Sequence, residues 1–177
     1  MPEKVLLVID MLKDFLDPDG ALTCGEEARR IVPFVAGKVK EFTEENLPVI
    51  FLMDAHDPED LEFLRFPRHC VFGTPGAALI EELRALVEEY PFAIKVPKTR
   101  FSGFYRTNLS GILSDLAPEE VHVVGVCTNI CVLYTVEELA NRDYRTIVYE
   151  KGVASFDPEA HRWALSQMKS VLGAEVR

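Results

Sequence analysis

Cys131 has the sequence setting best suited to nucleophilic chemistry. It lies in the segment GVCTNICVLYTV, where Thr128 or Asn129 can cap a helix that begins there. The thiol would then lie in the first helical turn, where free backbone N–H groups and the helix dipole lower a thiol pKa and can hold an oxyanion. The alternative is a buried packing cysteine in an apolar helix. Cys127 lies four residues earlier, which is not the CxxC redox spacing, so we expect it to be a packing or loop residue.

Asp10 and Lys98 are the residues that could serve such a thiol. Asp10 directly follows the apolar run VLLVI, and Lys98 follows Val96 and Pro97. A carboxylate near a partly dry strand end can shift its pKa toward neutrality and act as a general base and acid. An ammonium group beside the thiol would stabilise the thiolate. The alternatives are a loop-capping aspartate and a solvated surface lysine.

Asp54, His56, His69 and Glu62 have the residue types of a divalent metal site. Residues i and i+2 of an extended segment point to the same side, so we expect Asp54 and His56 to aim at one point. His69 and Glu62, in the loop that follows, could complete the site. Two histidines with carboxylates suit one Zn²⁺ ion, or Mn²⁺ or Fe²⁺. The alternative is a pair of surface loop histidines.

Short apolar runs rich in valine and isoleucine predict the strands that would position these groups. They are Val5–Ile9, Val49–Met53, Phe92–Val96, Val121–Val126, Thr146–Tyr149 and Ala174–Val176. Helical spacing predicts helices over about Glu26–Glu45, Ala77–Glu89, Leu109–Leu116, Ile130–Arg142 and Pro158–Leu172. Strands that alternate with helices imply right-handed crossovers and a parallel sheet covered on both faces. We therefore predict an α/β fold, a three-layer α/β/α sandwich whose mainly parallel sheet has about six strands.

The reactive residues fall at the carboxyl ends of these predicted strands. In an open parallel sheet, ligands bind at these ends, near the point where the strand order reverses. Asp10, Asp54, Lys98 and the loop that leads to Cys131 each follow a different strand. The two long loops, roughly Asp14–Gly25 and Asp54–Pro75, are where we expect function to lie.

Length and composition predict one domain over residues 1–177. The chain is 48% apolar and 27% charged, which excludes wholesale disorder, and its net charge of −10 disfavours nucleic acid and membrane surfaces as partners. The sequence has neither a bilayer-spanning apolar run nor a signal-peptide pattern at its start, so we expect a cytoplasmic location. Apolar residues on helix faces would serve either a core or an interface, which leaves a homo-oligomer open.

The remaining cysteines and histidines are assigned to the structure rather than to chemistry. In a cytoplasmic protein, Cys24, Cys70, Cys127 and Cys131 are expected to be free thiols rather than two disulfides. His122 and His161 are assigned to packing or to the surface.

Several segments resemble, in order, the isochorismatase-like cysteine hydrolases and, within them, the nicotinamidases (pyrazinamidases). VLLVIDMLKDF is similar to the opening strand with its I-D-x-Q-N-D-F segment, and DAHD to the D-x-H metal motif. FPRHCVFGTPGA and KTRFSGFYRTNL resemble the second metal segment and the lysine motif. GVCTNICVLYTV resembles the G-V-x-T-D-x-C-V loop, and KGVASF a late strand and loop. The resemblance covers nearly the whole chain.

The resemblance implies a catalytic role for four residues. Cys131 would be the nucleophile, Asp10 the proton shuttle and Lys98 the third member of the triad. The backbone N–H groups of Cys127 and Cys131 would form the oxyanion hole, beside a cis peptide between Val126 and Cys127. The implied reaction converts nicotinamide to nicotinate and ammonia through a cysteine thioester.

The same resemblance implies the groups that hold the substrate. A divalent metal, with zinc the first expectation, would bind the pyridine nitrogen and be held by Asp54, His56 and His69. Glu62 matches a fourth ligand found in some members. Phe15, Phe66 and Phe101 match positions that enclose the pyridine ring.

The sequence also departs from the family pattern, and two other functions stay open. Leu12 and Lys13 replace the usual Q-N, Asn129 replaces the usual aspartate, and the stretch before His69 is short. These changes affect the shape of the pocket. One alternative is a metal-independent hydrolase of a small carbamoyl amide, of the ureidoacrylate or carbamoylsarcosine type. Another is a non-enzymatic redox-sensing α/β module in which Cys127 and Cys131 report oxidation.

Overall fold

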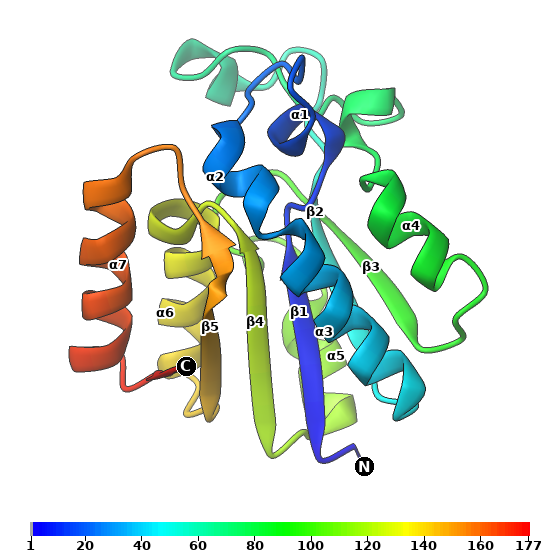
Figure 1. Ribbon diagram of the computed structural model, residues 1–177, viewed down its shortest axis with the longest axis vertical. Coiled ribbons are helices and arrows are strands. Elements are labelled where there is room, and N and C mark those ends of the chain that lie inside the picture. The colour runs from blue at the N-terminus through cyan, green and yellow to red at the C-terminus, as the bar shows by residue number, and fades with distance from the viewer. Residues whose placement is uncertain (1) are drawn as a thin grey trace.

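A parallel β-sheet of six strands forms the centre of the protein, whose computed structural model describes residues 2–177 (Figure 1). The strands lie in the order β3-β2-β1-β4-β5-β6, and every neighbouring pair is parallel. Their bounds are β1 Lys4–Ile9, β2 Val49–Asp54, β3 Ala93–Lys98, β4 Glu120–Val126, β5 Thr146–Ala154 and β6 Glu175–Val176. The predicted strands and the parallel sheet are confirmed.

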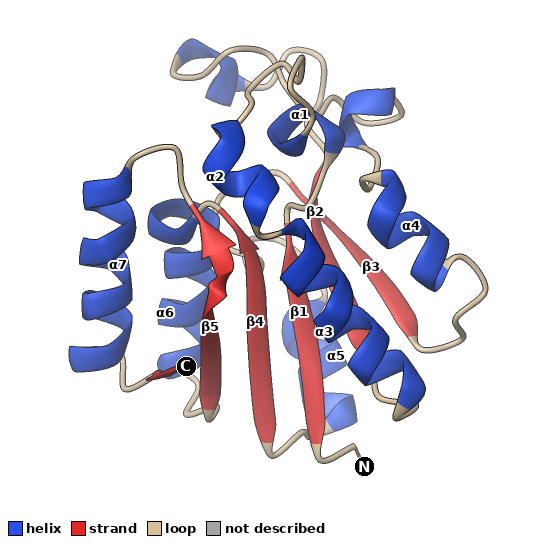
Figure 2. Ribbon diagram, viewed as in Figure 1, coloured by secondary structure: helices blue, strands red, loops and turns tan. Residues whose placement is uncertain are grey.

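Helices cover both faces of the sheet, so the predicted three-layer sandwich is also confirmed (Figure 2). The helices α2 to α4 pack on one face and α5 to α7 on the other. The bounds are α1 Lys13–Leu16, α2 Gly25–Arg30, α3 Val32–Glu44, α4 Glu81–Val87, α5 Leu109–Leu116, α6 Leu133–Ala140 and α7 Pro158–Ser170. Shorter turns are η1 Leu61–Leu64, η2 Pro75–Ala77 and the π-helical η3 Thr128–Val132.

The strand β1 shows why its apolar run is continuous. Leu6 and Val8 lie in the core beneath α2 to α4, whereas Leu7 and Ile9 lie in the core beneath α5 to α7. All four are at most 1% exposed. Each buried side chain of this size stabilises the fold by roughly 1.5–3 kcal/mol, so a strand covered on both faces gains from every position.

The structure differs from the predicted elements mainly at helix boundaries. The predicted helix Glu26–Glu45 is two helices that meet at Ile31, because Pro33 lacks the N–H group that would continue the helical hydrogen bonds. The strand β5 continues five residues beyond the predicted end at Tyr149, through a segment whose Glu150 and Lys151 are exposed. The short helix α1 lies in a stretch predicted to be a loop.

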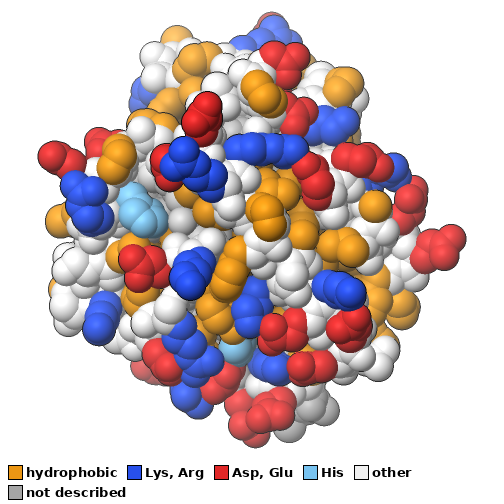
Figure 3. All heavy atoms as spheres, viewed as in Figure 1, with side chains coloured by type: hydrophobic (Ala, Val, Ile, Leu, Met, Phe, Trp, Pro, Cys, Tyr) orange, Lys and Arg blue, Asp and Glu red, His pale blue; other side chains and the backbone are white. Residues whose placement is uncertain are grey.

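The surface helices carry charges of both signs. On the face seen in Figure 3, basic side chains are interspersed with acidic and apolar ones. Ion pairs one helical turn apart join some of the surface charges, as Lys38–Glu41 does within α3 and Arg84–Glu88 at the end of α4. Within residues 2–177, no helix is both long enough and apolar enough to cross a bilayer.

Candidate active site

The strand order reverses between β1 and β4, and the two predicted catalytic groups lie beside this point. Asp10 directly follows β1, and Cys131 lies on η3, which follows β4. The close approach of the strands requires Gly125, since a Cβ atom there would lie 2.0 Å from the carbonyl oxygen of Ile9 and its φ is +123°. Asp10 has a φ of 51°, a strained conformation for a residue with a side chain. The predicted crevice therefore lies at the carboxyl edge of the sheet.

Lys98 is the last residue of β3, and its ammonium group joins the polar residues of the other strands. Its Nζ lies 2.8 Å from Oδ2 of Asp10, 2.5 Å from Oδ1 of Asp54 and 3.5 Å from Sγ of Cys131. Lys98 is 1% exposed, so the interpretation of it as a solvated surface lysine is wrong. Asp10 also accepts the backbone N–H of Asp54 at 2.9 Å. The structure thus brings together the three residues of the predicted triad.

Burial and charge set the protonation states in this cluster. Burial, together with the negative charge of Asp54, raises the pKa of Asp10 to about 6, although Lys98 acts in the opposite direction. Burial also raises the pKa of the Cys131 thiol well above its usual value, again against the effect of Lys98. Burial disfavours the charged form of Lys98, but Asp10 and Asp54 outweigh it and raise its pKa. The cluster therefore holds a cation beside a thiol and a titratable acid.

Two details of the predicted nucleophile loop are wrong. The pKa of Cys131 is raised rather than lowered, because burial of the thiol disfavours the thiolate. Neither proposed residue caps the turn: Thr128 Oγ1 pairs with Nδ1 of His161 at 2.8 Å, and Asn129 Oδ1 accepts a hydrogen bond from Ser155. Cys131 still lies in the first turn after β4, and the peptide that precedes Cys127 is cis, as expected.

Asp54, His56 and His69 come together as the sequence predicts. Their ligand atoms lie within 4.8 Å of one another, and all three residues are buried. His56 Nε2 is 3.5 Å and His69 Nε2 is 3.9 Å from Oδ2 of Asp54. The Nδ1 atom of His69 donates to the carbonyl oxygen of Pro67 at 2.6 Å, which leaves its Nε2 as an acceptor. The interpretation of the two histidines as surface loop residues is wrong.

The chemistry of this donor set fits a divalent metal ion. Among the described residues, the buried Nε2 of His56 and Oε2 of Glu62 have no hydrogen-bond partner. An unpaired buried polar atom is costly, and a cation at this point would compensate it. Glu62 is 2% exposed, and its Oε1 lies 3.9 Å from Nε2 of His56. Burial and the negative charge of Asp54 raise the pKa of Glu62, which a bound cation would oppose.

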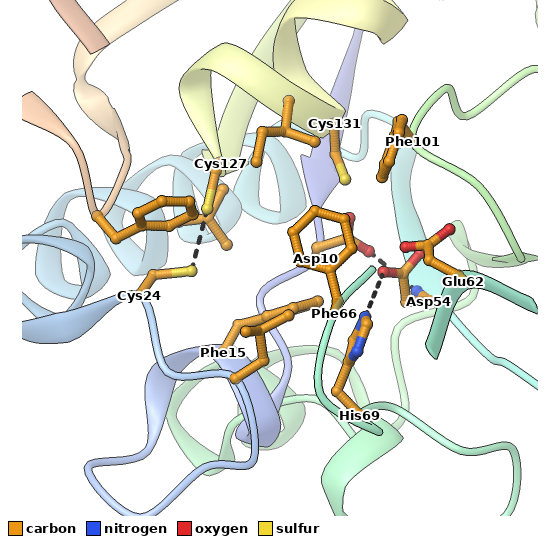
Figure 4. Close-up of a pocket in the computed structure, with 14 residues that line it drawn as sticks. Asp10, Phe15, Cys24, Asp54, Glu62, Phe66, His69, Phe101, Cys127 and Cys131 are labelled. Atoms are coloured by element: carbon orange, nitrogen blue, oxygen red, sulfur yellow. Dashed lines mark hydrogen bonds and ion pairs between the residues drawn. The ribbon is translucent and has the colours of Figure 1, made fainter. Parts of the chain in front are cut away.

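A pocket with largely apolar walls connects the cysteine to the candidate metal ligands. Figure 4 shows Asp54, Glu62 and His69 on one side of the pocket and Cys24 and Cys127 on the other. Phe15, Phe66 and Phe101 line it as predicted. The complete lining is Asp10, Phe15, Leu22, Cys24, Asp54, Glu62, Phe66, His69, Phe101, Val126, Cys127, Ile130, Cys131 and Phe156.

The family of the chain follows from a comparison with known proteins. The family model for the isochorismatase domain matches residues 4–177. The chain belongs to the isochorismatase family. Proteins of this family are hydrolases, and the resemblance drawn from the sequence is confirmed.

Several known proteins are similar to this chain over nearly their whole length. PncA of Bacillus subtilis is 38% identical over 98% of both chains, and a crystal structure of this nicotinamidase/pyrazinamidase has a TM-score of 0.94 with 99% of both chains covered. The pyrazinamidase of Pyrococcus horikoshii, in complex with zinc, has 30% identity, a TM-score of 0.90 and 99% coverage of both chains. The N-carbamoylsarcosine amidase of Thermoplasma acidophilum has 32% identity and a TM-score of 0.87, covering 100% of this chain and 96% of that one.

The other cysteines and His122 of this isochorismatase-family chain are buried. All four cysteines, which fall within the described residues, are free thiols, as expected. Sγ of Cys127 lies 3.0 Å from Sγ of Cys24, a pair that sequence reasoning missed because the two are far apart in the chain. His122 is buried between the Tyr149 hydroxyl at 2.8 Å and Glu120 at 3.0 Å. The assignment of His122 to packing is therefore confirmed.

Sequence reasoning also missed two polar residues beside the candidate metal ligands. Asp60 accepts a hydrogen bond from Nδ1 of His56 at 3.0 Å, and Arg100 donates to Asp60 at 2.9 Å. One signal was available: Asp60 follows His56 by four residues in HDPED, which places a carboxylate within reach of the ring. Arg100, which belongs to a separate segment, gave no such signal.

Proposed function

We propose that this protein hydrolyses the carboxamide group of nicotinamide, pyrazinamide or a close analogue to a carboxylate and ammonia. The observation that carries the proposal is the position of Lys98, whose ammonium group contacts Asp10, Asp54 and Cys131 at once. This ammonium group links the pair formed by Cys131 and Asp10 to the cluster of buried residues that could bind a metal. Residues of the pair and of the cluster line one pocket with aromatic walls. The nicotinamidase of Bacillus subtilis and the pyrazinamidase of Pyrococcus horikoshii, both similar to this chain, support the same choice.

Acylation begins with a proton transfer within the triad. The Cys131 thiol gives its proton to Asp10, whose pKa of about 6 suits a group that accepts and returns protons near neutral pH. Lys98 stabilises the thiolate that results, from 3.5 Å. The sulfur attacks the amide carbon, and the C=O electrons move to oxygen. The backbone N–H groups of Cys127 and Cys131 then hold this oxyanion, and losing one such donor typically costs about 3–4 kcal/mol of barrier.

Collapse of the tetrahedral intermediate and hydrolysis complete the cycle. The C=O bond re-forms, the C–N bond breaks, and Asp10 gives its proton to the leaving nitrogen, which departs as ammonia and leaves a thioester on Cys131. A water molecule next gives a proton to Asp10 and attacks the thioester carbon. The C–S bond breaks, and Asp10 returns the proton to the sulfur.

The metal end and the aromatic walls of the pocket would position the ring. Asp54, His56 and His69, with Glu62 beside them, would hold one divalent ion, most simply zinc and otherwise manganese or iron. When bound, the ion supplies a Lewis-acid site for the lone pair of the ring nitrogen. Phe15, Phe66 and Phe101 would enclose the ring and fix its carboxamide beside Cys131.

A metal-independent hydrolase of a small carbamoyl amide is the second candidate. The similarity to the N-carbamoylsarcosine amidase of Thermoplasma acidophilum favours it, at 32% identity over the whole of this chain. The buried Nε2 of His56, which has no hydrogen-bond partner in the described part of the chain, favours the metal-dependent reaction instead. A redox module based on Cys127 and Cys131 has less support, because the structure pairs Cys127 with Cys24.

Ammonia release from a substrate panel tests the proposal. We expect the wild type to release ammonia from nicotinamide and pyrazinamide, to lose this activity on chelation, and to regain it with Zn²⁺, Mn²⁺ or Fe²⁺. The Cys131→Ala variant should be slower by on the order of 10⁴-fold or more, with an unchanged circular dichroism spectrum. Equal rates for Cys131→Ala and wild type would exclude the thiol nucleophile. Chelation-resistant release from N-carbamoylsarcosine alone would favour the second candidate.

A further inference from the structure

Asp60 is a buried carboxylate on the Nδ1 side of the His56 ring. Its Oδ2 lies 3.0 Å from Nδ1 of His56, and its side chain is 7% exposed. Its Oδ1 accepts the backbone N–H of Glu62 at 2.8 Å and so caps the turn η1. One carboxylate therefore contacts two of the four candidate metal ligands, the ring of one and the backbone of the other.

Arg100 holds this carboxylate in place. Its NH1 lies 2.9 Å from Oδ1 and 3.0 Å from Oδ2 of Asp60, and 3.8 Å from Oε2 of Glu62. The backbone of Arg100 also belongs to the catalytic cluster, because its carbonyl oxygen accepts a hydrogen bond from Nζ of Lys98 at 3.1 Å. The same residue thus contacts the triad through its backbone and the candidate metal ligands through Asp60.

The hydrogen bond from His56 decides which ring nitrogen is free. A carboxylate only accepts, so Nδ1 of His56 carries the proton and Nε2 keeps its lone pair. That Nε2 is the buried atom that lacks a partner among residues 2–177, and it faces Asp54 and Glu62 at 3.5 and 3.9 Å. A carboxylate that accepts from the outer nitrogen of a ligating histidine fixes the ring and raises its basicity.

We propose that Asp60, clamped by Arg100, is the positioning residue of the metal centre: it fixes the His56 tautomer and the backbone of Glu62 so that both face one cation. The inference rests on the metal-dependent function proposed above. It also predicts a specific failure in Asp60→Asn. Asparagine has one acceptor oxygen, so it can serve His56 or Glu62 but not both, and its NH₂ group would face the remaining N–H donor.

Metal binding to chelator-treated protein tests this role without relying on catalysis. We expect calorimetric titration with Zn²⁺ alone to give a dissociation constant about 10- to 100-fold higher for Asp60→Asn than for the wild type. The visible absorption bands of the Co²⁺ form should shift as well, because the ligand geometry changes. Asp57→Asn is the matched control, since Asp57 lies in the same loop but its Oδ1 accepts only the exposed backbone N–H of Glu59.

A second variant keeps the test decisive if Asp60→Asn does not fold. Arg100→Gln removes the clamp but leaves both partners of the His56 hydrogen bond in place, and the Arg100 side chain is 30% exposed. We expect it to weaken Zn²⁺ binding in the same direction, toward the lower end of that range (about 10-fold).

The outcomes separate this inference from the proposed function. If folded Asp60→Asn and Arg100→Gln bind Zn²⁺ as tightly as the wild type, the positioning role is overturned, while ammonia release by the wild type still supports the amidase. If the wild type itself binds no Zn²⁺, the inference falls together with the metal part of the proposal. Ammonia release from nicotinamide then decides whether the cysteine chemistry stands alone.

Discussion

Replacement of Lys98 by methionine is the perturbation whose effect the structure defines best. Methionine keeps most of the aliphatic volume but removes the ammonium group that lies between Asp10 and Asp54. These carboxylates are 1% and 3% exposed, so water cannot replace the lost partner. We expect the chelated Lys98→Met protein to be less stable than the chelated wild type. With Zn²⁺ supplied to both proteins, the variant should have lost nearly all ammonia release, because the thiolate of Cys131 also loses its cation.

Two limits set the loss of stability that we expect in Lys98→Met. Removing one partner of a buried ion pair costs about 3–5 kcal/mol. Asp10 can lower this cost by taking up a proton and becoming neutral. Because its pKa is about 6, keeping Asp10 protonated at pH 8 costs at most about 3 kcal/mol. We therefore expect a loss of about 3 kcal/mol at pH 8, which is about 6–12 °C in melting temperature for a domain of this length. This is less than the usual total stability of a domain, so the variant should still fold.

The stability lost in Lys98→Met should depend on pH in a definite direction. Without the ammonium group, the pKa of Asp10 rises further above the unfolded value of about 3.9. The pKa of Asp54, which burial raises but Lys98 and His56 bring below its usual value, rises as well. The folded variant then binds protons more readily than its unfolded chain, so its stability is retained at low pH and falls as the pH rises. The gap between wild type and variant should widen between pH 5 and pH 8.

Thermal unfolding of chelated protein at both pH values is the assay. Lys95→Met is the matched control, since Lys95 lies on the same strand but is exposed, and its change should stay within about 0.5 kcal/mol. A Lys98→Met melting temperature equal to that of Lys95→Met at pH 8 would refute the electrostatic reasoning, as would a gap that narrows with rising pH.

Three further predictions test separate parts of the structure. Gly125→Ala should destabilise the protein by more than about 2 kcal/mol in urea unfolding, because its Cβ would meet the Ile9 carbonyl, whereas Gly111→Ala in α5, with open space around it, should stabilise by about 0.5–1 kcal/mol. Phe101→Leu should raise the KM for nicotinamide about 2- to 10-fold with a smaller change in kcat, and an unchanged KM would remove Phe101 from the ring-binding set. Burial lowers the pKa of His122 despite the opposing effect of Glu120, so the stability of the protein should fall as the pH drops below about 6.5. In His122→Gln, the urea midpoint should fall less between pH 7.5 and pH 5.5 than it does in the wild type. An equal fall in both proteins would contradict the lowered pKa of His122.

The strands could be predicted from the sequence because most of them are buried on both faces. A short apolar run such as Val121–Val126, with helical patterns before and after it, is typical of a strand covered on both sides. The bounds predicted for helix α5 agree with those observed, Leu109–Leu116. Boundaries were missed where a single residue decides them, as at Pro33, or where pairing with neighbours extends a polar segment, as in β5 beyond Tyr149.

The candidate site was predictable to the extent that strand ends position it. Asp10, Asp54 and Lys98 were found because parallel strands place their carboxyl ends at one edge. The protonation state of Cys131 could not be predicted, since it depends on how deeply neighbouring segments bury the thiol. Asp60 and Arg100 were missed for a similar reason: their contact joins two loops whose relative position no local pattern encodes.

The sheet order has a consequence for how this protein gains and loses activity. Adjacent strands β3, β2, β1 and β4 each deliver one polar group to the cluster, Lys98, Asp54, Asp10 and Cys131, from segments spread over most of the chain. A folding intermediate in which β3 or β4 has not yet paired would therefore be inactive, even if its other strands were native. Return of ammonia release after denaturation would thus report completion of the central sheet more stringently than the recovery of secondary structure.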